Sequence, residues 1–394
     1  MNTYSNDGKV CRHRRFLRLS RTLACLVALP SLFSAPLKPA KVDITTITPD
    51  EERYYHGWPT VARLSDGQLM VVWSGGRDAH VCPFGRVESM VSSDRGLTWS
   101  WPRVILDSPI DDRDAGLLET AKGTLLLTTF GSTGYRRAGH LERYGQQPEK
   151  WKRAMHAVPV DLGIKLAGAK LLRSEDRGLT WSPPQDMPVN SPHGPMQLKD
   201  GRLLYPGVNF VGLGIDYKPD ERRVGAWESS DDGVTWSLAG FIPLRPGDQA
   251  IDYHELHGIE ATDGTLVVLI RSHAKRGPRE MLQTDSRDGG KTWTVPRPIG
   301  LQGYPPHLTR LNDGRLLLSY DHRTPPYGVQ ARFSSDHGAT WSEPVIITEN
   351  PKKLDQGYPS TVQLDDHSFL SVWYEVSPGK KKAVLKQARW TVQE

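Results

Sequence analysis

Cysteine is scarce in this 394-residue chain, which contains only three: Cys11, Cys25 and Cys82. The first two lie in an amino-terminal leader, so removal of the leader leaves one cysteine and no internal disulfide can form. Long apolar runs are also missing after residue 40, where nothing approaches the roughly 18 residues that span a membrane. The sequence therefore predicts a domain without a membrane span that is held together by its apolar core.

An excess of one charge is missing as well, once the leader is set aside. The chain has 50 Lys and Arg against 45 Asp and Glu, and residues 1–36 hold six of the basic and one of the acidic residues, which leaves 44 of each. Proteins that bind nucleic acid carry a basic surface. The balanced domain therefore gives no electrostatic case for a nucleic-acid partner.

The leader places six basic residues before the apolar stretch "TLACLVALPSLFSA". A basic segment followed by about 7–15 apolar residues is typical of a secretory signal. We expect residues 1–40 to be an export signal with a short linker, cleaved near Ala35 or Ala40, and residues 41–394 to be a domain exported to the periplasm or the extracellular space. The alternatives are an uncleaved anchor and a wrongly assigned start.

A nine-residue phrase of the form S-x-D-x-G-x-T-W-S/T occurs five times, beginning at Ser92, Ser174, Ser229, Ser286 and Ser334. Its Asp can bind backbone amides, its Gly can take a left-handed conformation, and its Trp can pack beneath the turn. A strand–turn–strand phrase such as "ARLSDGQLMVVW" precedes each copy, and a sixth, "VQLDDHSFLSVWY", lies near the carboxyl terminus. Asp-Gly between apolar runs is a strong signal for a β-hairpin.

Two hairpins in each repeat make a four-stranded blade, and periods of 40–50 residues are typical of propellers. The sequence predicts an all-β fold, a six-bladed β-propeller of four-stranded antiparallel blades. The early segment "KVDITTITP" is expected to pair with the last blade and close the ring.

The five phrases resemble the Asp-box of the sialidase (neuraminidase) superfamily, and the resemblance covers about residues 45–392. It implies a sialidase-type propeller and an exo-glycosidase that releases a terminal acidic sugar, by default sialic acid, from a glycan without a cofactor. Asp-boxes also occur in other glycosidases and in non-catalytic receptors. The boxes themselves are expected to stabilise turns rather than to form sites.

The starts of the first strands and the ends of the second strands should meet on one face of the ring. There the resemblance implies a nucleophile at Tyr358, its base at Glu255 and an acid at Asp78. The anomeric carbon of sialic acid carries a carboxylate, which would repel a carboxylate nucleophile, so a phenol deprotonated by a glutamate suits the reaction.

Side chains on the same face are expected to bind the substrate: Arg271, Arg323, Arg77, His56, Asp114 and Tyr304. The sequence departs from the family at the first blade, where "HGWP" places Gly57 at the position of the first arginine of the carboxylate-binding triad. Arg77 or Arg113 are the possible substitutes. Another acidic sugar, or a neutral one, is therefore nearly as consistent with the sequence as sialic acid.

Two alternative functions and two readings of one insertion stay open. The domain could be a non-catalytic glycan-binding propeller, or it could carry another chemistry such as polyuronate lysis. The long insertion at residues 132–162 could be a lid over the site or a solvated excursion. Histidines crowd the same face, but they lack the spacing of metal ligands, so no metal is expected: His193, His254, His257 and His307. We expect a monomer.

Overall fold

The computed structural model describes residues 38–49, 53–145, 147–209, 222–275, 280–350 and 352–393. The predicted export signal and its two cysteines lie outside the described residues. Residues 36–394 form one compact unit, and its first strand begins at Pro39, inside the segment that the sequence assigned to the linker. Across the described ranges, no helix is long and apolar enough to cross a membrane.

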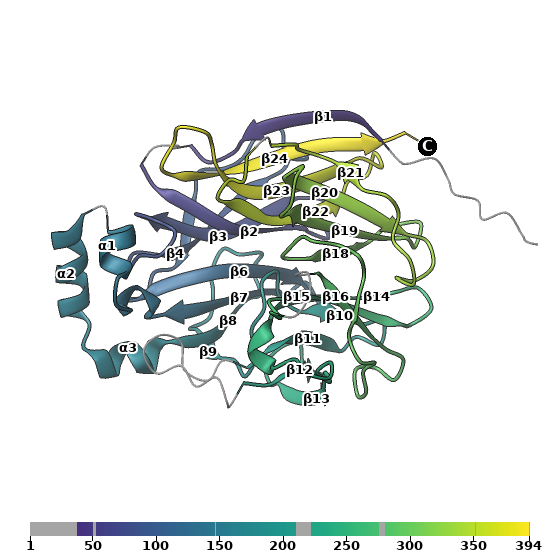
Figure 1. Cartoon of the computed structure of the whole chain (residues 1–394), viewed down its shortest axis with the longest axis horizontal. Coiled ribbons are helices and arrows are strands. Elements are labelled where there is room, and N and C mark those ends of the chain that lie inside the picture. The colour runs from purple at the N-terminus through teal and green to yellow at the C-terminus, as the bar shows by residue number, and fades with distance from the viewer. Residues whose placement is uncertain are drawn as a thin grey trace, which may run out of the picture. The chain divides into compact units, whose positions relative to one another are not determined.

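The unit is built from six sheets of four antiparallel strands, which confirms the predicted six-bladed propeller (Figure 1). In blades one to five the strands follow chain order from the axis outward. Blade one contains β2 (Tyr55–Arg63), β3 (Leu69–Arg77), β4 (Arg86–Ser92) and β5 (Arg103–Leu106). Blade two contains β6 (Asp111–Glu119), β7 (Leu125–Ser132), β8 (Gly168–Ser174) and β9 (Gln185–Asp186). Blade three contains β10 (Met196–Gln197), β11 (Leu203–Val208), β12 (Val224–Ser229) and β13 (Ser237–Phe241).

The second half of the ring repeats this plan. Blade four contains β14 (Tyr253–Glu260), β15 (Leu266–Ser272), β16 (Leu282–Ser286) and β17 (Arg297–Pro298). Blade five contains β18 (His307–Arg310), β19 (Leu316–His322), β20 (Gly328–Ser334) and β21 (Val345–Ile346). Blade six contains β22 (Gln356–Gln363), β23 (Phe369–Val376), β24 (Ala383–Val392) and, on its outer edge, β1 (Pro39–Thr46).

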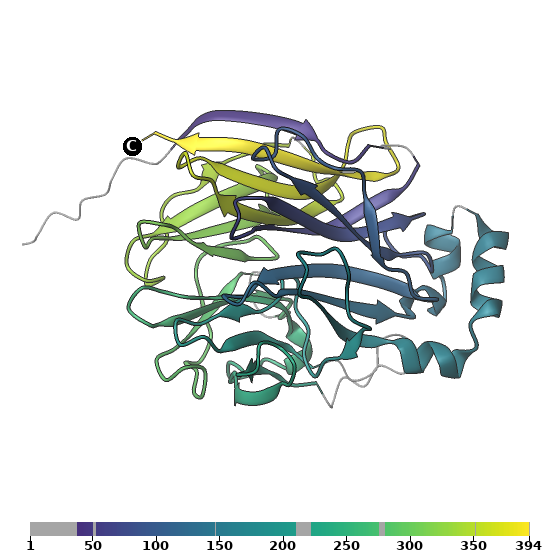
Figure 2. The ribbon, with the colours of Figure 1, turned by 180° about the vertical axis from the view of Figure 1, so that it is seen from behind.

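The ring is closed at both its outer and its inner edge. Strand β1 pairs antiparallel with β24, as the sequence predicts, and the two lie side by side in both views (Figures 1 and 2). At the inner edge the backbone N–H of Val61 in blade one donates to Ser360 Oγ in blade six, at 3.1 Å. Closure of this kind protects sheet edges that would otherwise be free to pair with another chain.

All five Asp-boxes join the third and fourth strands of blades one to five, and they share one set of bonds. In the first box, Ser92 Oγ donates to Asp94 Oδ1 at 2.7 Å, and the N–H of Thr98 donates to the same oxygen at 2.9 Å. Gly96 has a φ of 81°, and its N–H donates to Ser92 Oγ. The folded turn therefore has the two features predicted from the sequence: an Asp that accepts bonds from backbone amides and a Gly in a left-handed conformation.

The insertion folds into three helices, α1 (His140–Tyr144), α2 (Pro148–Ala157) and α3 (Val160–Leu166), at one edge of the ring (Figures 1 and 2). Its centre is Trp151, which is fully buried. A small apolar cluster, which we call the cap cluster, joins the insertion to blades one and two: Cys82, Ile110, Tyr135, Trp151 and Val158. The segment is thus a packed cap rather than a solvated excursion.

Candidate functional site

The inner strands of four blades carry a β-bulge close to the axis. In blades six, one and two, two residues oppose one: Tyr358 with Pro359, Trp58 with Pro59, and Asp114 with Ala115. The first residue of each pair has a left-handed φ, of 56°, 56° and 46° respectively. Such conformations are strained for residues other than glycine and cluster at functional sites, where bulges redirect side chains. The bulges are therefore what places these three side chains at the site.

The fourth bulge, in blade four, sets Glu255 beside Arg271 of the neighbouring strand. The Tyr358 hydroxyl donates a hydrogen bond to Glu255 Oε1, and Arg271 Nη1 donates to Glu255 Oε2 at 2.6 Å. Arg271 Nε is itself 2.8 Å from His273 Nε2. Tyr358 of blade six and Glu255 and Arg271 of blade four, which lie at matching offsets in the sequence, are thus linked by hydrogen bonds into one group.

The group has a defined resting charge state. Burial would raise the pKa of Glu255, but the positive charge of Arg271 and the bonds from Tyr358 and Arg271 outweigh it, and the pKa lies below its usual value. Burial and the charge of Glu255 raise the pKa of Tyr358 well above its usual value. Glu255 is therefore ionised at rest and Tyr358 is protonated, with its proton pointing at the carboxylate.

Two guanidinium groups lie against the ring of Tyr304. The guanidinium carbon of Arg271 lies 4.2 Å from the centre of the Tyr304 ring and that of Arg323 lies 5.0 Å from it. Arg323 Nε is 2.6 Å from Asp321 Oδ2, and Gln356 donates to the other oxygen of this carboxylate at 2.6 Å. Both arginine side chains keep a small exposed fraction, 17% and 18%, so their charges can reach a ligand.

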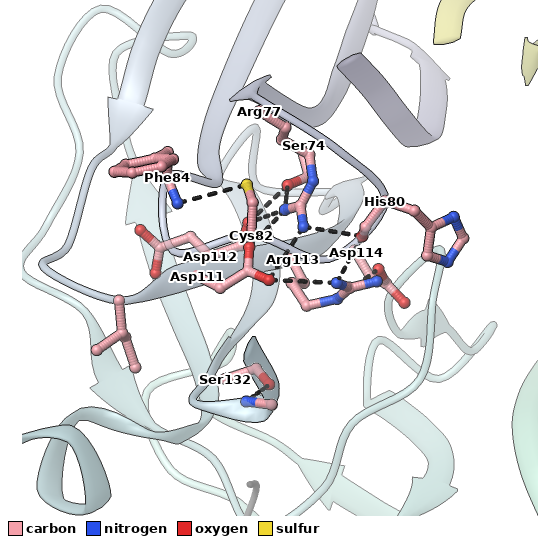
Figure 3. A network of polar contacts seen from close by, with 12 residues as sticks. Ser74, Arg77, His80, Cys82, Phe84, Asp111, Asp112, Arg113, Asp114 and Ser132 are labelled. Atoms are coloured by element: carbon pink, nitrogen blue, oxygen red, sulfur yellow. Dashed lines mark hydrogen bonds and ion pairs between the residues drawn. The ribbon is translucent and has the colours of Figure 1, made fainter. Parts of the chain in front are cut away.

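Two other predicted binding residues lie in the interior. Arg77 is fully buried, and its Nη1 and Nη2 bind the two oxygens of Asp111 at 2.5 and 3.0 Å, as Figure 3 shows. His56 is buried beneath the blade-one bulge, where its Nδ1 accepts a bond from Trp73 Nε1 at 3.0 Å. Bulge geometry is the reason, because the register shifts of β2 leave His56 bound to Trp73 while Trp58 contacts Tyr358.

Asp78 is held by the cap. Lys150 on α2 lies 3.0 Å from its Oδ2 and 3.2 Å from its Oδ1, and the Lys150 ammonium also lies 4.0 Å from the centre of the Phe84 ring. Lys382 donates to the Asp78 carbonyl oxygen. The structure therefore places Asp78 in an ion pair with the insertion, while Asp114 lies close enough to Tyr358 and Glu255 for their charges to interact.

Sequence reasoning missed Trp58, which occupies the side of the site where the family arginine is absent. Its ring lies 6.4 Å from that of Tyr358, and the guanidinium carbon of Arg113 lies 4.1 Å from its centre. The signal was available, since Gly57-Trp58-Pro59 in blade one repeats the Gly-aromatic-Pro phrase that surrounds Tyr358 in blade six.

A cavity of about 260 Å³ lies where α1 meets the starts of blades one and six, and His80 and Asp355 line it together with α1 residues. Tyr55 donates to Asp355 Oδ2 at 2.8 Å. The ring of Trp58 lies 5.1 Å from that of His80 and 6.4 Å from that of Tyr358, so it contacts both the lining of this cavity and the site. The cap thus borders the rim of the site.

Three histidines of the predicted group meet at the axis. The ring centres of His193, His257 and His307 lie 4.8 to 5.7 Å apart, and all three side chains are buried. Burial lowers the pKa of each one. His257 Nδ1 accepts the N–H of Leu308 at 2.9 Å, and across the described ranges no group of three or more His, Cys, Asp or Glu has the geometry of a metal site. The three histidines are therefore neutral rings that pack against one another and link neighbouring blades.

Comparison with known sequences places these features in context. The BNR repeat-like domain family matches residues 140–372, more than half of the chain. A xyloglucanase from Paenibacillus is 30% identical over 180 residues, which are 40% of this chain and 16% of the xyloglucanase. The match thus spans about a sixth of that relative's length.

Solved structures share the fold. A protein of unknown function from Dyadobacter fermentans superposes with a TM-score of 0.72 and 24% identity, over 91% of this chain and all of that one. The NanB sialidase from Streptococcus pneumoniae superposes with a TM-score of 0.63 and 16% identity, over 91% of this chain and 71% of that one. At these identities the likeness establishes the architecture, and the chemistry must be argued from the site.

Proposed function

Because the chain belongs to the BNR repeat-like domain family, among the BNR-repeat proteins of the sialidase superfamily, we propose that it is a glycoside hydrolase that releases a terminal acidic sugar from a glycan. The observation that carries the proposal is the hydrogen bond from Tyr358 to Glu255, whose other oxygen is held by Arg271. A phenol paired with an ionised carboxylate is an activated nucleophile, and the sugar it suits is one whose anomeric carbon already bears a negative group.

The reaction retains the anomeric configuration because it proceeds in two displacements. Tyr358 attacks the anomeric carbon as its proton passes to Glu255, and the bond to the leaving oxygen breaks. Water then attacks the same carbon from the opposite side, and the tyrosine oxygen leaves with the proton that Glu255 returns. Without the glutamate, a phenol with a pKa of ~10 would be a poor nucleophile at neutral pH.

The substrate itself activates the base in this scheme. Arg271 stabilises the ionised form of Glu255 at rest, and its partly exposed guanidinium is also a cation that can bind a sugar carboxylate. A carboxylate that binds Arg271 weakens this stabilisation and adds a second negative charge, and both effects raise the pKa of Glu255. Glu255 therefore becomes a stronger base only when an acidic sugar is bound.

Arg271 and Arg323 support an acidic rather than a neutral sugar. Both face Tyr304, and their partner carboxylates leave guanidinium edges partly exposed. With Gly57 in place of the first arginine of the triad, the residue on that side of the site is Trp58, with Arg113 on its ring. An aromatic surface here replaces a bidentate arginine clamp, so uronic acids as well as sialic acid are candidate substrates.

A panel of aryl glycosides tests the proposal, with a sialoside, a glucuronide, a galacturonide and neutral hexosides in parallel. We expect hydrolysis of an acidic member, with the first-formed anomer retained in a proton NMR time course. An unsaturated product would indicate a lyase instead, and specific binding without turnover would indicate a non-catalytic glycan-binding propeller.

A single substitution tests the nucleophile. Tyr358→Phe should lower turnover by roughly 100-fold or more, while ligand affinity and thermal midpoint stay close to wild type. Tyr54→Phe removes a half-buried phenol outside the site and should leave turnover unchanged. If Tyr358→Phe keeps more than about a tenth of the wild-type rate, Tyr358 only repeats the blade pattern and the two-step mechanism is wrong.

A further inference from the structure

The proposed reaction needs a proton donor for the leaving oxygen, and Asp78 is poorly placed to be that donor. Both of its carboxylate oxygens are within 3.2 Å of Lys150 Nζ, so it acts as the ion-pair partner of the cap. A proton donor must be protonated in the resting enzyme and face the reacting atoms. Asp78 would first have to leave Lys150.

Asp114 has the position that Asp78 lacks. It is the blade-two equivalent of Tyr358, because both are the first residue of a two-residue bulge and both have a left-handed φ, of 46° and 56°. Trp58 holds the same position in blade one, between them in the ring. Three consecutive blades therefore present Tyr358, Trp58 and Asp114 to the axis at the same level.

The surroundings of Asp114 favour a neutral carboxylic acid. Its side chain is only 9% exposed, and within the described part of the chain its buried Oδ1 has no hydrogen-bond partner. Arg113 Nε lies 4.0 Å away, beyond hydrogen-bonding distance, with Arg113 drawn beside Asp114 in Figure 3. Burial, helped by the charges of Glu255 and Asp111, raises the pKa of Asp114 to about 7, although the charges of Arg113 and Arg77 oppose the rise.

We propose that Asp114 is the general acid and base of this enzyme, in place of Asp78. This inference rests on the proposed glycosidase function. In the first step the Asp114 carboxyl donates its proton to the glycosidic oxygen as the bond from that oxygen to the anomeric carbon breaks and the bond from Tyr358 forms. In the second step the Asp114 carboxylate takes a proton from the attacking water, which restores the acid.

Leaving-group dependence tests this role, because a good leaving group departs without protonation. Asp114→Asn should lower kcat/KM by about 100-fold or more on a natural disaccharide or an alkyl glycoside, but by less than about 10-fold on an activated aryl glycoside of the same sugar. The wild-type rate should fall as pH rises through about 7, since Asp114 then loses its proton. The variant should lack this alkaline limb.

Two further measurements separate catalysis from misfolding and from a positioning role. Azide should accelerate Asp114→Ala and yield a glycosyl azide, because a small anionic nucleophile needs no general base in the second step. Asp112→Asn is the matched control, since Asp112 is also buried on β6 but accepts bonds from Ser108. It should keep the wild-type ratio between the two substrate types.

The outcomes of this experiment distinguish the inference from the function on which it rests. If wild type hydrolyses neither substrate, the proposed function is wrong and the role of Asp114 falls with it. If wild type is active and Asp114→Asn slows both substrates equally, or leaves both unchanged, the inference alone is overturned. The same holds if Asp78→Asn, and not Asp114→Asn, shows the leaving-group pattern.

Discussion

Trp151 holds the helical cap on the propeller, and its removal should release the cap while the blades stay folded. The side chain is fully buried in the cap cluster, whose members do not belong to the apolar clusters of the blades. Truncation of a buried tryptophan to alanine usually costs about 3–5 kcal/mol. Since every ~1.4 kcal/mol is a factor of ten, the opening equilibrium of the cap should rise by roughly 100- to 4,000-fold.

Cys82 reports this opening directly. Its thiol is buried in the same cluster, and burial raises its pKa, so it should react slowly with a thiol reagent in the closed cap. The assay uses the full chain with C11S and C25S, so that Cys82 is its only thiol. Trp151→Ala should accelerate labelling of Cys82 by about the factor of the opening equilibrium, if closing is faster than labelling.

The main thermal transition should move by only a few degrees, because the blades keep their own cores. Trp101→Ala is the control, since that tryptophan is 78% exposed and should change neither labelling nor melting. Unchanged labelling in Trp151→Ala would refute the cap as a unit that opens by itself. A drop of the main transition by more than about 10 °C would refute the separation of the cap from the blades.

Two further predictions concern the repeats and the axis. Asp231→Ala should lower the free energy of unfolding by ~1–2 kcal/mol in urea titrations and leave turnover per folded molecule unchanged. The reason is that, within the described residues, Asp231 accepts bonds from its own turn alone, from Ser229, Val234 and Thr235. Bonds from Thr235 lower the pKa of Asp231 to about 2. The stabilisation is therefore fully present above pH ~4, the pKa of the unfolded group, and the stabilities of wild type and variant should converge as pH falls through about 2. A loss of activity at normal stability would contradict the structural role. His307→Gln should be less stable than wild type at pH 8, but the gap should narrow below pH ~6.5 by up to about 1.4 kcal/mol per unit, since the folded-state pKa of His307 is lowered and its unfolded form takes up the proton first. Wild type must be compared with this variant, because burial raises the pKa of Asp112, Asp114 and Asp321 to about 7, and these groups make the wild-type stability change with pH in the opposite direction. If the stabilities of the two proteins run parallel from pH 8 to below pH 6.5, His307 is not held neutral.

The architecture could be predicted because its signals are local. An Asp-Gly turn between apolar runs and an Asp-box each depend on bonds among residues at most four positions apart, such as those from Thr98 to Asp94. Such bonds form in the same way in any blade, so the count and order of the phrases determined the number of blades. Even the departure at blade six follows the rule, since His367 takes the left-handed turn position with a φ of 60° where other blades have glycine.

Part of the site was determined in the same way. Glu255, Arg271 and Tyr358 lie at equal offsets from turn residues, and strands of equal length bring equal offsets to one level of the ring. The structure brings the three side chains into contact. Their catalytic roles stay a prediction, to be decided by the substitutions described above.

Tertiary structure alone decided which of the other polar residues face the site. Arg77 and Asp111 meet across blades one and two, and Lys150 of the insertion reaches Asp78 from 72 positions away in the chain. No local pattern encodes such pairs, because they depend on how separate blades and the cap pack. The bulges act likewise. Residues two apart in a regular strand share a face, but the pairing of β2 with β3 shifts between Tyr55 and Gly57 and again between Gly57 and Thr60. His56 therefore binds Trp73 within the blade, while Trp58 lies against Tyr358.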